Sequence, residues 1–260
     1  FSLTMPLLFL AWLSLVWSTA SGAGFTVHNI AARRAALWTQ WSHNETQRKA
    51  LGGLLDARRD ALQPGAVFPD MLYTCGSQHY AGEEAHWVPF QMAAIDYIRE
   101  RYPNWAKSPR SGPGPGLVAF MMGVVSHYIV DVNWHGLVQV PGGEGLIRTM
   151  GFSDFNCSGT LCPAAHSAAD SGAEIVAAYE SDISWFPSQW YVPTVDLVDI
   201  FATAYRDKCF HSPYCKLVQG QWIQECSITF YVASWAISRF GASLYRLASD
   251  LLPFRTLLPE

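Results

Sequence analysis

The stretch that decides the fold is Gly123–Leu137, GVVSHYIVDVNWHGL, whose apolar background predicts a buried helix. It also carries His127, Asp131 and His135, spaced four residues apart. On an α-helix, three residues with this spacing lie within about 80° of one another, so these side chains share one stripe. A buried carboxylate between imidazoles is costly unless its charge is compensated. This stripe alone leaves two interpretations open: a hydrogen-bonded core triad, or a divalent cation bound by nitrogen and oxygen ligands.

A second segment repeats the spacing and favours the metal. Ala165–Asp170 reads AHSAAD, so His166 and Asp170 also stand four residues apart on a predicted helix. Two such helices that face each other can build a metal site in the core of a helical bundle. Glu174 continues this stripe and competes with Asp170 as a ligand. Further candidates elsewhere in the chain are His28, Asp70 and His86. Together these residues predict a multinuclear metal site.

The composition excludes several classes of protein. The chain has 260 residues, of which 50% are hydrophobic and 15% charged, enough to bury a sizeable core. The aromatic content of 14% excludes a disordered chain. A net charge of −4 gives no reason to expect a polyanion-binding surface, so nucleic acid is not an expected partner.

Residues 1–23 have the pattern of a secretory signal peptide. Pro6–Trp17 is an apolar run, shorter than the ~20 residues that a membrane span needs, and small residues follow it. Cleavage is expected after Ala20, Gly22 or Ala23. We therefore expect a secreted, extracellular protein whose mature domain covers residues 24–260.

Cysteines and sequons agree with secretion. The chain has six cysteines, which is typical of an oxidising compartment but leaves the disulfide pairing open. Glycosylation sequons begin at Asn44 and Asn156.

Apolar residues at three- and four-residue spacing predict an all-α, multi-helix bundle with long loops. The expected helices are 30–41, 49–62, 88–101, 117–138, 164–185, 195–205 and 227–252. The Gln-Pro-Gly sequence at 63–65 is expected to end the second helix, and residues 66–84 to form a loop that contains Asp70. The segment 108–116, SPRSGPGPG, predicts a linker without regular structure.

An ordered set of motifs carries a family resemblance. The motifs are His28, FPD at 68–70, AHWVPF at 85–90, SHYIVDVNWHGL at 126–137, LIRTMG at 146–151, AHSAAD at 165–170 and WYVP at 190–193. In this order they resemble the catalytic domain of glycosylphosphatidylinositol (GPI)-specific phospholipases D. These enzymes are a branch of the zinc-dependent phospholipase C and single-strand-specific nuclease superfamily. The resemblance covers about residues 24–205 and implies an all-α fold with three zinc ions.

The resemblance also implies which residues bind each zinc. The first ion would take Asp70, His86, His127 and Asp131. The second would take His135, His166 and Asp170. The third would take His28, a share of the bridging Asp131, and the backbone amine and carbonyl of the mature N-terminal residue, which is Ala23 if cleavage follows Gly22.

Catalytic roles follow from the same resemblance. Zinc lowers the pKa of a bound water to about 7, which provides hydroxide for attack on a phosphodiester. Asp70 is expected to accept the proton of the water, and Asp131 to bridge two ions. Arg148 is expected to meet a phosphate or inositol oxygen, with a structural salt bridge as the alternative.

The expected substrate is the anchor of GPI-linked proteins or a phospholipid, reached by peripheral membrane contact and cleaved on the phosphatidic acid side. The alternatives are a phospholipase C or nuclease of the same superfamily, and an inactive secreted module that keeps its metals. The short gap between Asp131 and His135 matches the GPI-specific branch. That branch carries a C-terminal β-propeller, and no strand-rich repeats follow here, so we expect a truncated or reduced member.

Overall fold

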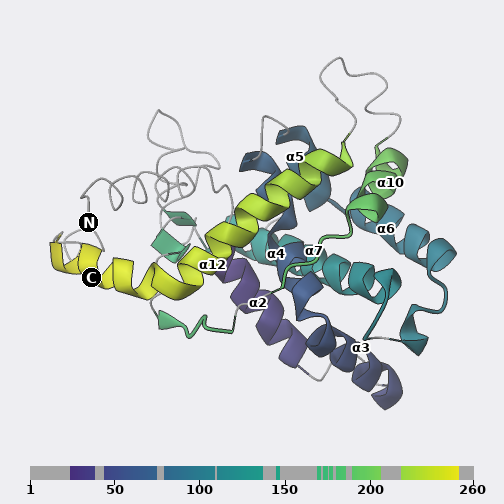
Figure 1. Ribbon diagram of the computed structural model, residues 1–260, viewed down its shortest axis with the longest axis horizontal. Helices are drawn as coiled ribbons and strands as arrows, with labels where there is room; N and C mark the ends of the chain where they lie inside the picture. Colours follow the sequence, from purple (N-terminus) through teal and green to yellow (C-terminus); the bar gives the residue numbers. More distant parts are fainter. Residues whose placement is uncertain are drawn as a thin grey trace.

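Helices make up every element that is bounded in the described part of the computed structural model, which confirms the all-α prediction (Figure 1). The structure describes residues 24–38, 44–74, 79–108, 110–136, 145–146, 169–170, 172–174, 176–177, 180–185, 189–205 and 218–251. The α-helices are α2 (Phe25–Leu37), α3 (Glu45–Ala57), α4 (Arg59–Thr74), α5 (His79–His86), α6 (Val88–Arg101), α7 (Pro113–His135), α10 (Thr194–Ala204) and α12 (Gly220–Leu251). A 3-10 turn, η1 (Trp105–Lys107), follows α6.

Several predicted boundaries are confirmed and others move. The bounds of α6 are those predicted, and α10 differs by one residue at each end. The described residues between 169 and 180 are helical, in agreement with the predicted helix 164–185, but its predicted end is wrong because residues 181–185 are not helical. α12 begins at Gly220 rather than at residue 227, because Ile223 and Cys226 extend its buried face toward the N-terminus.

The loop predicted for residues 66–84 is wrong, because α4 and α5 occupy most of it. α4 runs through Pro64 and Pro69. A proline inside a helix lacks an N–H group and so leaves the carbonyl four residues earlier without its usual partner. For Pro64 this carbonyl belongs to Asp60, and it accepts a hydrogen bond from the backbone N–H of Tyr191 at 2.7 Å. A contact from far along the chain therefore stabilises a helix that the local pattern argues against.

Glycines allow α4 and α7 to touch through their backbones. A Cβ atom on Gly65 would lie 2.0 Å from the carbonyl oxygen of Phe120, and one on Gly123 would lie 2.2 Å from that of Leu62. No larger residue fits at either position without moving a helix. This close crossing brings the C-terminal halves of both helices, which carry the predicted ligands, to the same place in the fold.

The predicted linker at 108–116 is partly helix, because α7 begins at Pro113. Proline is well tolerated in a first helical turn, where its missing N–H would have no partner. Gly112 precedes the helix with a φ of 92°, which favours glycine, and its carbonyl accepts a hydrogen bond from Arg58. By length and composition α7 could cross a membrane. It instead lies at the centre of the bundle, and we assign it to the core.

The core is built around aromatic side chains from four helices. Phe68 of α4 lies with its ring centroid 6.5 Å from Phe90, 5.1 Å from Phe120 and 6.3 Å from Phe201. All four side chains are buried. They fix α6, α7 and α10 around α4, which leaves the opposite end of the α4–α7 pair for polar residues.

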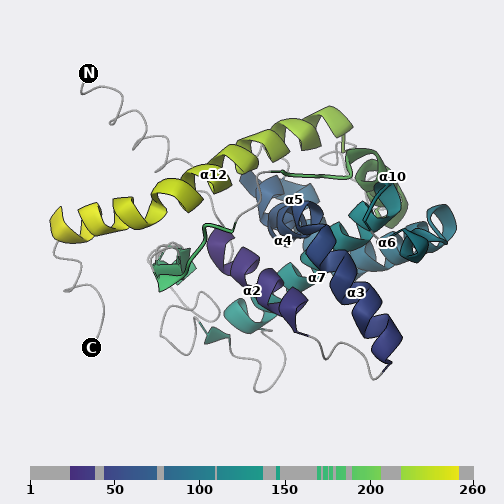
Figure 2. The same ribbon diagram turned by 60° about the horizontal axis from the view of Figure 1, so that its bottom comes forward.

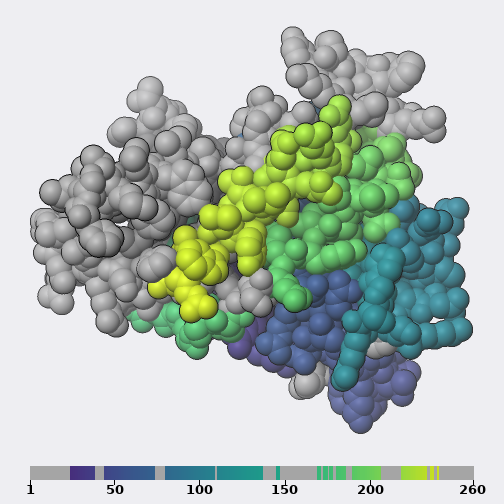
Figure 3. All heavy atoms as spheres, viewed as in Figure 1, coloured from purple at the N-terminus to yellow at the C-terminus, as the bar shows by residue number. Residues whose placement is uncertain are grey.

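The outer helices surround this central pair. α2, α3, α5 and α6 lie around α4 and α7, and the long α12 crosses the molecule from the side of α10 to that of α2 (Figures 1 and 2). In the space-filling view α12 lies over the front face beside α10 (Figure 3). Its buried Ile223 and Phe230 join the same hydrophobic core.

Candidate metal centre

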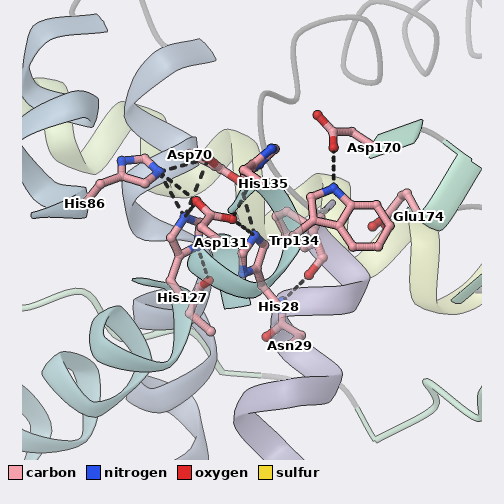
Figure 4. Close-up of polar contacts among 12 residues, drawn as sticks. His28, Asn29, Asp70, His86, His127, Asp131, Trp134, His135, Asp170 and Glu174 are labelled. Atoms are coloured by element: carbon pink, nitrogen blue, oxygen red, sulfur yellow. Dashed lines mark hydrogen bonds and ion pairs between the residues drawn. The ribbon is translucent and has the colours of Figure 1, made fainter. Parts of the chain in front are cut away.

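Residues from four helices converge at the polar end of the α4–α7 pair (Figure 4). α2, α4 and α5 contribute one residue each, and α7 contributes the stripe predicted from its sequence. They are His28, Asp70, His86, His127, Asp131 and His135. The loop predicted around Asp70 is instead the interior of α4, so a rigid element positions this carboxylate.

Four of these residues form one compact group. Asp70, His86, His127 and Asp131 each offer a ligand atom, and these atoms all lie within 4.8 Å of one another. His86 Nε2 lies 3.4 Å from Asp70 Oδ1 and 3.3 Å from Asp131 Oδ2. His127 Nε2 lies 3.1 Å from Asp131 Oδ2. Two imidazoles and two carboxylates are a donor set that zinc prefers.

Hydrogen bonds on the far side of each ring fix which nitrogen faces the group. Nδ1 of His86 lies 2.8 Å from the carbonyl oxygen of Gly82, and Nδ1 of His127 lies 2.8 Å from that of Ala66. A carbonyl oxygen can only accept, so each Nδ1 carries a hydrogen and each neutral ring turns the lone pair of its Nε2 inward. The two Nε2 atoms lie 3.0 Å apart. Two facing lone pairs at this distance require a proton or a cation between them.

His28 lies beside this group without a hydrogen-bond partner for either ring nitrogen in the described part of the chain. The side chain is buried, and its Nε2 lies 3.3 Å from Asp131 Oδ1 and 3.6 Å from Asp70 Oδ2. Its ring stacks on His127 with centroids 3.8 Å apart. Asp70 Oδ1 and Asp131 Oδ1 also lack hydrogen-bond partners. Buried polar atoms are rarely left unsatisfied, so these orphaned atoms fit a site built for a cation.

The pKa shifts of these residues also fit a site built for a cation. Burial opposes ionisation of Asp131, but the imidazoles of His127 and His28 hold its pKa well below its usual range. Burial lowers the pKa of His86, yet contacts with Asp131 and Asp70 outweigh burial and raise it to about 10. Burial and the neighbouring His28 lower the pKa of His127. In the metal-free protein, a proton on His86 therefore serves the two carboxylates.

His135 and Asp170 lie at the edge of the site. His135 Nε2 is 3.8 Å from Asp131 Oδ1, so Asp131 stands between His135 and His28. Asp170 is buried and accepts a hydrogen bond from Trp134 Nε1 at 2.7 Å, and it lies apart from the four-residue group (Figure 4). The structure therefore does not bring Asp170 into that group, and its role at a second ion stays a prediction.

Glu174, the alternative to Asp170 as a ligand, has its two oxygens directed elsewhere. Oε2 accepts a hydrogen bond from the backbone N–H of Thr26 at 2.5 Å, and Oε1 accepts one from the Thr26 hydroxyl. Burial raises the pKa of Glu174 to about 7, although the hydrogen bonds from Thr26 oppose this shift. The Glu174 side chain therefore contacts the first turn of α2 through both of its oxygens.

Three predicted site residues lie outside the described residues: Ala23, Arg148 and His166. Five of the six cysteines do so as well, and the disulfide pairing stays open. The sequence did not point to the carbonyls of Ala66 and Gly82, since a backbone group has no signature in a residue pattern. Trp134 stands one residue before His135 and was detectable only as a neighbour of that motif.

Comparison with known proteins identifies the family of this chain. A model of the zinc-dependent phospholipase C family matches residues 27–232. The chain belongs to this family. The matched range contains every described residue of the candidate centre. The name of the family suggests zinc, and the Asp/His group fits a metal site.

Curated relatives carry a more specific name. Phosphatidylinositol-glycan-specific phospholipase D of Dictyostelium discoideum is 34% identical over 250 residues, which cover 94% of this chain and 24% of that protein. The rat protein of the same name is 39% identical over 196 residues (74% and 22%). The human one is 33% identical over 239 residues (90% and 26%). The chain thus spans about a quarter of the length of these relatives. No solved structure matches it.

Proposed function

We propose that this chain is a secreted, zinc-dependent phosphoric diester hydrolase that cleaves the anchor of GPI-linked proteins in the phospholipase D manner. One observation carries the metal assignment: the inward lone pairs of His86 and His127, 3.0 Å apart, meet the carboxylates of Asp70 and Asp131. The substrate class is supported by the relatives named phosphatidylinositol-glycan-specific phospholipase D.

Zinc binding divides among three proposed sites. Asp70, His86, His127 and Asp131 would hold the first ion. Asp131 uses Oδ2 toward His127 and Oδ1 toward His28 and His135, which suits a bridging carboxylate. His28 with the mature N-terminal residue would hold one further ion. His135 with His166 and Asp170 would hold the other.

The residues of the chain prepare the site for phosphodiester hydrolysis. When bound, zinc supplies hydroxide near neutral pH and neutralises charge on the phosphate oxygens. The carbonyls of Ala66 and Gly82 keep His127 and His86 in the tautomer whose lone pair faces inward. Asp70 is our candidate to accept the proton of the attacking water, because its Oδ1 has no hydrogen-bond partner within the described residues. Arg148 is proposed to contact the phosphate or the inositol.

Exposed apolar side chains stand next to the metal ligands. Trp87 and Val88 follow His86, and Trp87 packs against Tyr128, the residue after His127; the exposed fractions of Trp87 and Val88 are 43% and 47%. A rim of this kind suits a phosphodiester presented at a membrane surface. It supports peripheral contact of the protein with the lipid that bears its substrate.

The products of cleavage test this function. The zinc-loaded protein is incubated with membranes that carry a GPI-anchored reporter, and the lipid product is identified by mass spectrometry. Release of the reporter with phosphatidic acid is expected, with loss of release on chelation and recovery on readdition of zinc. Diacylglycerol would instead assign a phospholipase C. An absence of turnover on GPI anchors, phospholipids and oligonucleotides would assign a metal-binding module.

A matched pair of aspartates controls the experiment. Asp131→Asn should abolish release of the reporter and lower the zinc content. Asp96→Asn removes the charge of an exposed aspartate on α6 and should change neither. Equal zinc content in both variants would contradict the metal assignment.

A further inference from the structure

The first turn of α2 lacks a cap of its own. Its N-cap residue is Gly24, which has no side chain to accept hydrogen bonds. The first N–H groups of any helix have no partner within the helix, and a buried N–H without a partner is costly. Thr26 lies in this turn and is fully buried, so water does not reach its N–H group.

Glu174 supplies the missing cap from 148 residues away. Its carboxylate accepts hydrogen bonds from both the backbone N–H and the hydroxyl of Thr26. A carboxylate at a helix N-terminus also interacts favourably with the helix dipole. The fit is close, because a Cβ atom on Gly24 would lie 2.8 Å from Glu174 Oε2. Gly24 also has a φ of 87°, where glycine is favoured.

The capped turn leads directly into the metal centre. The backbone N–H of His28 donates to the carbonyl of Gly24 at 3.2 Å, so the turn that Glu174 holds ends at His28. His28 in turn has its Nε2 within 3.3 Å of Asp131 Oδ1, and no hydrogen bond of its own orients its ring within the described residues. The orientation of the ring therefore depends on the backbone that carries it, on the stack with His127 and on the longer ion-pair contacts with Asp131 and Asp70.

We propose that Glu174 is a positioning residue, which caps α2 from a distant segment and thereby holds His28 at the metal centre. This inference rests on the proposed function, because it requires His28 to bind zinc. It assigns Glu174 a role that differs from the ligand role for which it competed with Asp170.

The test measures zinc affinity by competition with a chromogenic chelator, on full-length protein without N-glycans. Glu174→Ala should weaken binding by about 10–100-fold, the usual effect of removing a group that orients a ligand. Glu174→Gln should restore near wild-type affinity, because its amide can accept from the Thr26 N–H and donate to the hydroxyl. Thr26→Val, which keeps the buried N–H contact, should give a smaller loss in the same direction.

Asn44→Ala is the matched control for loss of a helix cap. Asn44 Oδ1 accepts hydrogen bonds from Thr46 and Gln47 at the start of α3, which carries no candidate ligand. This variant should lower the melting temperature but leave zinc affinity unchanged. If Glu174→Ala behaves like Asn44→Ala, or if Glu174→Gln loses as much affinity as Glu174→Ala, the positioning role is overturned.

A His28→Ala variant separates this inference from the proposed function. Weaker zinc binding by His28→Ala together with unchanged binding by Glu174→Ala overturns the inference alone. Unchanged zinc binding by His28→Ala overturns the inference together with the assignment of His28 as a zinc ligand, because Glu174 then has no ligand to position. Loss of zinc by Asp131→Asn would still support the proposed function in that case. A cobalt-loaded sample adds a spectroscopic readout: Glu174→Ala should change the visible absorption bands, and Glu174→Gln should return them.

Discussion

His86 and His127 face each other across 3.0 Å, yet their pKa values shift in opposite directions in the metal-free protein. Burial disfavours the protonated, charged form of both imidazoles, and so removes stabilisation from that form. His86 regains it from two carboxylates, whereas His127 lies next to a third imidazole. A proton on His86 thus serves Asp70 and Asp131 in the absence of a metal ion, and zinc must displace this proton to bind.

This competition predicts that the stability of the metal-free protein falls with pH while the affinity for zinc rises. The pKa of His86 is raised to about 10 on folding, so its contribution to the stability of the metal-free protein is complete below about pH 6.5 and is lost as the pH rises through 10. The melting temperature of chelator-treated protein should fall from pH 7 to 10. Apparent zinc affinity should rise by up to tenfold per pH unit over the same range.

Thermal melts and zinc titrations at matched pH values measure both responses. Asp70→Asn provides the internal comparison, because it neutralises one of the two carboxylates that raise the pKa of His86. In this variant the metal-free melting temperature should depend less on pH. A zinc affinity that stays constant from pH 7 to 9 would contradict the displacement of a proton from His86.

The sequence predicts the identity of these ligands better than their orientation. Asp131 lies four residues after His127 on one helix, so their proximity follows from helical geometry alone. Asp70 and His86 come from other helices. They were candidates by residue type, and the family resemblance rather than any spacing assigned them to one ion with His127. The Gly82 and Ala66 carbonyls that orient the rings depend on packing, which a single sequence does not display.

At the scale of the elements, the contact between α4 and α7 determines whether the ligands meet. Gly123→Ala would place a Cβ 2.2 Å from the Leu62 carbonyl oxygen and 2.6 Å from the Ala66 backbone nitrogen. Backbone atoms cannot move aside as a side chain can, so the helices must separate, at a cost of about 1–3 kcal/mol. Separation also lengthens the hydrogen bond from His127 to the Ala66 carbonyl. We expect lower stability in chemical denaturation and weaker zinc binding.

Gly53→Ala is the control for this substitution. Gly53 lies in α3, and a Cβ there would have no atom within 4 Å. Because alanine favours the helix over glycine by up to about 1 kcal/mol, this variant should be more stable than the wild type, with unchanged zinc binding. Equal stability of Gly123→Ala and Gly53→Ala would contradict the backbone contact between α4 and α7.

The same elements explain where sequence-based boundaries were wrong. Pro64 was expected to end a helix, but the hydrogen bond from Tyr191 to the Asp60 carbonyl satisfies the group that proline leaves open. The prolines of the predicted linker instead begin α7, because a first turn does not need their N–H groups. Local propensity identified α6, α7 and α10 but missed the second half of α4 and all of α5. A tertiary hydrogen bond carries α4 past Pro64, whereas the start of α7 follows from local proline chemistry.

At the scale of the whole molecule, an apolar rim formed by Trp87, Val88 and Tyr128 lies beside the metal ligands His86 and His127. Trp87 packs edge-on against Tyr128 with ring centroids 6.4 Å apart, and its Nε1 donates to Glu83 at 2.7 Å. The polar group of the indole is therefore satisfied, while 43% of the residue is exposed. Such side chains favour the boundary between water and lipid.

This rim should contribute to binding of phosphatidylcholine vesicles. Burying one valine in an apolar environment is worth about 1.5–3 kcal/mol when complete, so Val88→Ser should weaken vesicle binding by roughly tenfold. Trp87→Ala should do the same. The exposed positions of both residues limit the effect on folding, which unchanged zinc content would verify. Vesicle co-sedimentation measures the affinity without requiring turnover.

Val195→Ser is the control for exposed apolar surface outside the rim. Val195 lies on α10, carries no proposed role and is 76% exposed. If vesicle binding falls equally in Val195→Ser and Val88→Ser, the rim has no special role. If it falls only at the rim, the ratio of activity on vesicular substrate to activity on a short-chain soluble phosphodiester should fall by the same factor. The membrane would then be held where Asp70 and Asp131 can reach the phosphodiester.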